Sequence, residues 1–130
     1  SHRLFSEEKR DAVLGPIYMG MKEDFNKYSL HEVCALQWLR CVEKAEYDLN
    51  QFAPERIHRI RYEDFVSHPV FEFKRLGDFL GIEMTEQLIN DLSARLHTKS
   101  IGKGRRSLNE KTAKLVEKLI GKKLRQYEYL

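Results

Sequence analysis

The sequence predicts a mostly α-helical chain with about one β-strand, a composition expected for one part of an α/β domain. Three observations support this fold class. Apolar residues recur at helical spacing in several segments. Two of those segments follow a Ser-x-x-Glu sequence that can cap a helix. One short run, Ile57–Tyr62, alternates like a strand. The length of 130 residues suits a single domain or partial domain over residues 1–130.

The composition is that of a globular protein from a reducing compartment. Hydrophobic residues make up 42% and charged residues 33%, which excludes a disordered chain, and the net charge of +3 does not by itself indicate nucleic acid. No apolar run approaches the roughly 20 residues that a membrane span needs. Cys34 and Cys41 lie on one predicted helix about 10 Å apart, too far for a disulfide. We therefore expect a cytoplasmic protein with both cysteines in its core.

Two helices are expected in the first half of the chain. One covers residues 4–14, and residues 17–28 form a loop or a short helical turn. A longer helix starts at Ser29, because Ser29 and Glu32 have the spacing of a capping box. Its apolar period continues to about Phe52.

Three more helices are expected in the second half. Pro69–Leu80 has proline as its first residue and Gly81 as its stop. Met84–Leu96 repeats the apolar period, and the last helix follows a second capping box at Ser107 and Glu110. Four aromatic residues are expected to pack in the core rather than to contact a ligand: Trp38, Phe71, Phe73 and Phe79.

The single predicted strand has no visible partner in the sequence. A lone strand cannot place its backbone hydrogen bonds. The strand Ile57–Tyr62 therefore favours membership of a larger α/β domain over a self-sufficient fold.

A basic loop, residues 95–106, interrupts the even spread of charge. No acidic residue occurs between Asp91 and Glu110, and glycine and serine separate the positive charges of this loop. Several cationic donors beside flexible backbone are what a phosphomonoester, with close to two negative charges, requires. The basic loop therefore predicts an anionic partner.

Three segments together resemble the sulfotransferase family. In chain order they read "ALQWLRCVEKA", "RYEDFVSHPVFEFKRLGDFLGI" and "TKSIGKGRRSLNEKTAKLVEKLIGKKLRQYEY", and they span Leu30 to Tyr129. The resemblance implies a P-loop-like α/β fold with a parallel sheet flanked by helices. It also implies the cofactor 3′-phosphoadenosine 5′-phosphosulfate, whose product is adenosine 3′,5′-bisphosphate, and transfer of a sulfuryl group to a hydroxyl or amine acceptor.

The resemblance also assigns roles to individual residues. The family's Gly-rich loop after an N-terminal strand, and its catalytic base, have no counterpart here, so the chain is expected to be the C-terminal part of such a domain and inactive alone. It would supply the 3′-phosphate and adenine side of the nucleotide site. Tyr62 matches the tyrosine that approaches the adenine, and five residues match the loop that closes over the nucleotide: Lys99, Ser100, Gly102, Lys103 and Arg105. No catalytic residue and no metal site are predicted in this chain.

Other interpretations remain open at this stage. Tyr62 could be a half-buried structural residue, and the basic loop could be merely solvated. The chain could also be a small helical module that binds nucleic acid or another protein through residues 95–106. The expected partners are the nucleotide, an acceptor, and either an N-terminal half or a second copy of the chain.

Overall fold

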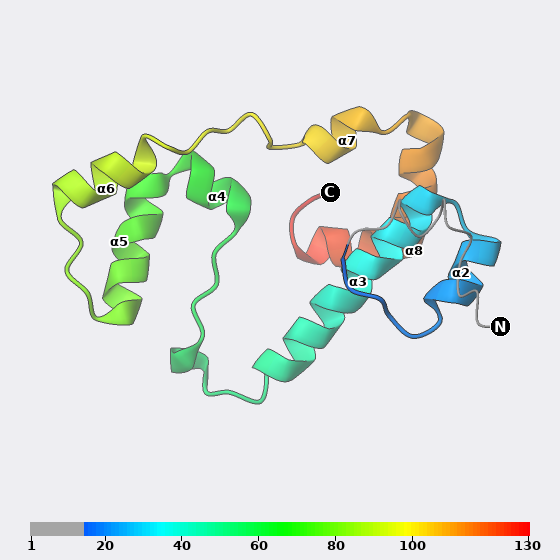
Figure 1. The fold of residues 1–130 in the computed structure, drawn as a ribbon, viewed down its shortest axis with the longest axis horizontal. Helices are drawn as coiled ribbons and strands as arrows, with labels where there is room; N and C mark the ends of the chain where they lie inside the picture. Colours follow the sequence, from blue (N-terminus) through cyan, green and yellow to red (C-terminus); the bar gives the residue numbers. More distant parts are fainter. Residues whose placement is uncertain (1–14) are drawn as a thin grey trace. The chain divides into compact units, whose positions relative to one another are not determined.

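A computed structural model describes residues 15–130, and every regular element in that part of the chain is helical (Figure 1). The predicted helix at residues 4–14 lies outside the described residues. The chain divides into two compact units. Unit 1 contains residues 15–51 and 108–130 of the described part, and unit 2 contains Phe52–Ser107.

Unit 1 is built from α2 (Met21–Lys27), α3 (Leu30–Leu49) and α8 (Glu110–Gln126). The capping box that begins α3 is confirmed: Glu32 N–H donates to Ser29 Oγ at 3.4 Å, and Ser29 N–H donates to Glu32 Oε2 at 2.9 Å. The ambiguous segment before it is helical as α2. The long helix ends at Leu49, slightly earlier than predicted.

The core of unit 1 lies where α2 meets the first turns of α3. Met21, Phe25 and Val33 are buried there, and Tyr18 and Tyr28 pack against them. Further along α3, the half-buried ring of Trp38 meets two tyrosine rings edge-on, with centroid distances of 6.3 and 6.5 Å. These tyrosines, Tyr127 and Tyr129, follow the end of α8, so aromatic packing joins the last residues of the chain to α3.

Unit 2 contains a 3₁₀ turn and four helices. They are η1 (Pro54–Arg56), α4 (Tyr62–Ser67), α5 (Pro69–Leu80), α6 (Glu86–Ser93) and α7 (Lys103–Ser107). The predicted ends of α5 are confirmed, with Pro69 in its first turn and Gly81 left-handed at φ 67°. The helix predicted over Met84–Leu96 is shorter, because Thr85 caps α6 by accepting from Leu88 N–H at 3.2 Å.

The predicted strand is wrong for the described residues, since residues 15–130 contain no strand. The backbone is nevertheless extended at Ile57 (φ −120°, ψ 120°) and Arg61 (φ −86°, ψ 135°). Tyr62, the last residue of the predicted strand, is instead the first residue of α4. The physical reason is that a strand exists only as part of a ladder, and the described chain offers no second strand for this segment.

Two predictions about the core are also wrong. Phe73 is buried as expected, but Phe71 is 62% exposed and Phe79 is 39% exposed. Residues two apart on a helix point in nearly opposite directions, so one face of α5 cannot bury both Phe71 and Phe73. Cys34 and Cys41 are free and exposed rather than buried, because the buried side of α3 is formed by other residues of its first turns.

Candidate functional site

Tyr62 lies at a junction in unit 2, where the extended segment ends and α4 begins. The first turn of α4 closes when Phe65 N–H donates to Arg61 C=O at 2.9 Å. The Tyr62 side chain is 48% exposed, so half of its surface can meet a ligand. An exposed aromatic ring at the start of a helix can stack against a planar base.

The basic loop contains a turn that backbone hydrogen bonds hold in place. Ile101 N–H donates to Thr98 C=O at 3.0 Å, and Lys103 N–H donates to Ser100 C=O at 3.2 Å. Gly102 closes this turn in the left-handed region at φ 67°. A residue with a Cβ is strained in that region, so glycine here has a conformational reason.

The Arg106 side chain stabilises the loop by donating hydrogen bonds to the loop's own backbone carbonyls. Its guanidinium donates from Nη1 to Ile101 C=O at 2.7 Å and from Nη2 to Lys99 C=O at 3.5 Å. A Cβ at Gly102 would lie 3.1 Å from Arg106 Nη1, so the glycine also leaves room for this side chain. Sequence reasoning counted Arg106 only as one more positive charge. Its role depends on backbone carbonyls that no sequence pattern displays.

The five predicted loop residues share one feature, which is exposure to solvent: Lys99, Ser100, Gly102, Lys103 and Arg105. In the described chain, none of their side chains forms an ion pair. Three exposed cations therefore lie within seven residues on a turn that Arg106 organises. This donor set suits a phosphate group.

Two local predictions around the loop need correction. Its last residues are helical as α7, not irregular. Ser107 does not cap the last helix: its Oγ donates to Gly104 C=O at 2.8 Å, and α8 is capped by Asn109, which accepts from Thr112 N–H at 2.8 Å. Ser107 is the last residue of α7, so α8 begins only after it. Asparagine caps a helix as well as serine does, and Asn109 directly precedes the first residue of α8.

The structure does not bring all the predicted site residues into contact. Within residues 15–130, no hydrogen bond, ion pair or ring contact joins Tyr62 to the basic loop. The loop residues do lie together on one turn, whereas Tyr62 lies about forty positions earlier in the chain. A shared ligand between them stays a prediction.

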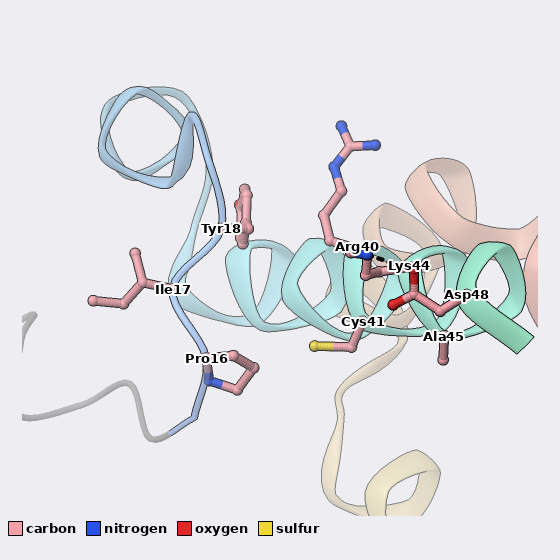
Figure 2. Close-up of a pocket in the computed structure, with 8 residues that line it drawn as sticks. All are labelled: Pro16, Ile17, Tyr18, Arg40, Cys41, Lys44, Ala45 and Asp48. Atoms are coloured by element: carbon pink, nitrogen blue, oxygen red, sulfur yellow. Dashed lines mark hydrogen bonds and ion pairs between the residues drawn. The ribbon is translucent and has the colours of Figure 1, made fainter.

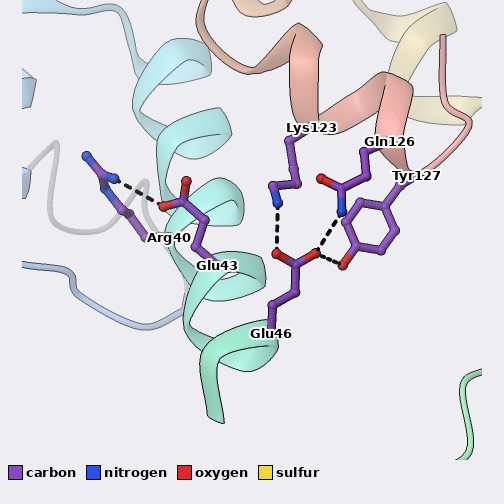
Figure 3. Close-up of polar contacts among 6 residues, drawn as sticks. All are labelled: Arg40, Glu43, Glu46, Lys123, Gln126 and Tyr127. Carbon is purple, nitrogen blue, oxygen red and sulfur yellow. Dashed lines mark hydrogen bonds and ion pairs between the residues drawn. The ribbon is translucent and has the colours of Figure 1, made fainter. Parts of the chain in front are cut away.

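A polar cluster on unit 1, missed by sequence reasoning, centres on Glu46 of α3 (Figure 3). Lys123 Nζ lies 2.8 Å from Glu46 Oε2, and Gln126 Nε2 donates to Oε1 at 3.4 Å. The Tyr127 hydroxyl donates to the same Oε1. The Glu46 and Lys123 side chains are only 24% and 18% exposed. The cluster therefore fixes α3 to α8 and serves the fold, not a ligand.

A shallow cavity of about 420 Å³ lies beside α3 in unit 1 (Figure 2). Its lining includes Pro16, Tyr18 and Cys41, and it contains none of the predicted nucleotide residues. Its two cations already have partners: Arg40 pairs with a glutamate at 3.2 Å and Lys44 with an aspartate at 2.5 Å, both on α3. It lacks the available charge that a phosphate site requires.

Tyr18, beside this cavity, gives a pH-dependent prediction. Burial raises the pKa of its hydroxyl well above the ordinary value near 10, and its hydrogen bond to Asp24 Oδ2 at 2.7 Å acts in the same direction. The unfolded chain ionises this tyrosine near pH 10 while the folded chain keeps it protonated. Its contribution to stability is therefore complete below about pH 10 and is lost as pH rises above that value.

We expect Tyr18→Phe to remove one late-titrating phenol from an alkaline titration followed at 295 nm. The same variant should lose less stability than the wild type between pH 10 and 11. Tyr47→Phe, which removes an exposed tyrosine of α3, controls for the loss of one phenol. An unchanged late fraction in Tyr18→Phe would contradict the assignment.

Among residues 15–130, no group of three histidine, cysteine, aspartate or glutamate side chains is placed to hold a metal ion. No helix in the same residues is long and apolar enough to cross a bilayer.

Comparison with known proteins gives a family match that covers Tyr62 but not the basic loop. No curated protein and no solved structure matches the chain. A model of the sulfotransferase family matches residues 9–86, which is more than half of the chain. The match includes Tyr62 and the extended segment before it, and it ends before the basic loop. The match is consistent with a partial sulfotransferase domain. It shows that the chain belongs to the sulfotransferase family.

Proposed function

We propose that this chain forms the nucleotide side of a sulfotransferase site that uses 3′-phosphoadenosine 5′-phosphosulfate. Five loop residues would hold the 3′-phosphate: Lys99, Ser100, Gly102, Lys103 and Arg105. The ring of Tyr62 would face the adenine. In the complete enzyme, the acceptor is a hydroxyl or an amine. Family membership supports sulfuryl transfer, and the loop geometry supports the choice of nucleotide.

The observation that carries the proposal is the turn held by Arg106. One guanidinium satisfies two loop carbonyls, at Ile101 and Lys99, and so removes acceptor oxygens that would repel an anion. Lys99, Lys103 and Arg105 are left exposed on the same turn. A phosphomonoester would meet charged donors on a loop that is already ordered, which lowers the entropic cost of binding.

The bound nucleotide supplies the sulfuryl group, and the residues of this chain hold and orient it. Positive charge from Lys99, Lys103 and Arg105 stabilises the phosphate groups of the nucleotide before and after transfer. Stacking on Tyr62 would fix the base and therefore the direction of the rest of the molecule. No base for the acceptor is assigned among these residues, so we expect residues 1–130 alone to lack transferase activity.

The extended segment supports the α/β fold of the proposed enzyme. Within the described chain, the backbone N–H and C=O groups of residues 58–60 make no hydrogen bonds. His58 packs flat against Phe79 of α5, with ring centroids 5.1 Å apart, so α5 contacts the segment at this residue. An extended segment with free backbone groups at residues 58–60 and a helix against one of its side chains is suited to join a parallel sheet in a complete domain.

Binding of adenosine 3′,5′-bisphosphate tests the proposal. We expect calorimetric titration to detect binding that requires the 3′-phosphate, with adenosine 5′-monophosphate at least about fivefold weaker. Lys103→Ala and Tyr62→Ala should each weaken the bisphosphate by about threefold to fivefold, since the first removes one exposed charge and the second removes the ring that would stack on the adenine. Lys22→Ala, at an exposed lysine of α2, is the control. Bisphosphate binding that does not respond to Lys103 would contradict the assignment of the loop.

A pair of glycine substitutions tests the shape of the loop separately from its charge. Gly102→Ala should weaken bisphosphate binding about fivefold, because alanine at φ 67° costs roughly 1–2 kcal/mol and crowds Arg106. Gly104→Ala makes the same chemical change two residues later, where a Cβ meets nothing within 4 Å, so binding should be unchanged. Equal effects of the two substitutions would show that the turn is not needed.

A further inference from the structure

The exposed side of α8 carries a row of positive charge that the nucleotide site does not use. Helix α8 contains six basic and two acidic residues, a net charge of +4 that exceeds the +3 of the whole chain. Five of the basic residues follow one another at intervals of three or four positions: Lys111, Lys114, Lys118, Lys122 and Arg125. At 100° per residue they fall within an arc of about 80° on the helix.

All five side chains of this cationic row are exposed. The two acidic residues of α8 pair with two of the five cations: Glu110 with Lys114 at 2.8 Å, and Glu117 with Arg125 at 3.5 Å. In the described chain, Lys111, Lys118 and Lys122 have no ion-pair partner. Lys118 and Lys122 lie one turn apart and Lys111 lies two turns before Lys118, so these uncompensated charges share one helical face and their repulsion is a cost that an anionic partner removes.

The sixth cation of α8 explains why the row is rigid. Lys123 turns toward Glu46 of α3, and Gln126 and Tyr127 donate to the same carboxylate. Buried Ala113 and Ile120 occupy the side of α8 opposite the cationic row. The row is therefore held on a fixed helix from Lys111 to Arg125, over about 21 Å.

We propose that the cationic row of α8 binds the phosphodiester backbone of a double-stranded nucleic acid without reading its sequence. A row of about 21 Å matches roughly six nucleotides of one strand at 3.4 Å each. A single strand fits less well, because base stacking needs exposed aromatic rings among the cationic residues and α8 contains no aromatic residue. A bilayer surface also fits less well, because the buried apolar residues of α8 are not available for insertion.

The test is the salt dependence of binding to a fluorescently labelled 20-base-pair DNA duplex, measured by anisotropy between 50 and 200 mM salt. The row variant carries Lys111→Gln, Lys118→Gln and Lys122→Gln. Its matched control carries Lys22→Gln, Lys27→Gln and Lys74→Gln, which removes the same charge from exposed positions on α2 and α5. Circular dichroism checks that both variants fold like the wild type.

We expect the row variant to bind at least about tenfold more weakly, and its slope of log affinity against log salt to become shallower by about 2.7, since each phosphate contact contributes about 0.9. The control should keep the wild-type slope. Equal losses in the two triple variants, or a loss that follows Lys99 and Lys103 instead, would overturn the proposal. Tighter binding to heparin or to phosphatidylserine vesicles at equal anionic charge would also overturn it, in favour of another polyanion.

Discussion

Gly77→Val is expected to lower the free energy of unfolding by about 3 kcal/mol. Gly77 is buried on α5, and a Cβ there would lie 2.5 Å from Met84 Cγ and 3.0 Å from Ile82 C=O. The chain folds back over Gly77 through a turn in which Ile82 N–H donates to Gly77 C=O at 2.9 Å. Because the turn is tied to the glycine it covers, it cannot move away without losing that hydrogen bond.

Urea unfolding followed by circular dichroism measures this effect. Gly104→Val is the matched control, because a Cβ at Gly104 meets nothing within 4 Å. Valine has a slightly higher helix propensity than glycine, so the control should leave the free energy of unfolding unchanged or raise it slightly. If both variants unfolded at the same urea concentration, the close approach at Gly77 would have no energetic importance.

Glu46→Ala is expected to cost about 2 kcal/mol of unfolding free energy. The substitution removes the acceptor for Lys123, Gln126 and Tyr127 together and leaves a mostly buried lysine without its counter-charge. The pair keeps some access to solvent, so the cost is smaller than for a fully buried ion pair. Lysine can also relax toward water through its flexible stem.

Glu43→Ala provides the comparison for Glu46→Ala on the same helix (Figure 3). Glu43 pairs with Arg40 at 3.2 Å, but their side chains are 45% and 54% exposed, so removal should cost under about 0.5 kcal/mol. The difference between the two variants should persist at 0.5 M salt, because screening weakens exposed pairs more than buried ones. A Glu46 effect as small as that of Glu43, or one abolished by salt, would argue against a structural role for the cluster.

The features that could be predicted from sequence are those fixed by neighbouring residues. Ser29 and Glu32 cap α3 with groups three positions apart, and Pro69 and Gly81 bound α5 through their own backbone preferences. The cap of α8 was not predicted correctly, because Ser107 and Asn109 are both good caps within one turn of each other. Their spacing alone does not say which one the helix uses.

The features that could not be predicted depend on distant parts of the chain or on backbone atoms. Whether the segment Ile57–Tyr62 becomes a strand depends on a partner strand, which local alternation does not supply. Glu46 and Lys123 are 77 positions apart, so no local pattern joins them. Arg106 donates to backbone carbonyls of its own loop, and its positive charge alone does not reveal this internal contact.

The division of the chain into units has a consequence for the entropy of folding. Unit 2 is inserted between the two halves of unit 1, so α3 and α8 can meet only when a segment of 56 residues, Phe52–Ser107, is closed into a loop. For a flexible segment of that length the closure term is on the order of 3.5 kcal/mol, apart from a constant. A folded insert has far less freedom to lose than a flexible one. The order that unit 2 acquires by its own packing therefore lowers the entropic cost of joining the two halves of unit 1, even without any contact between the units.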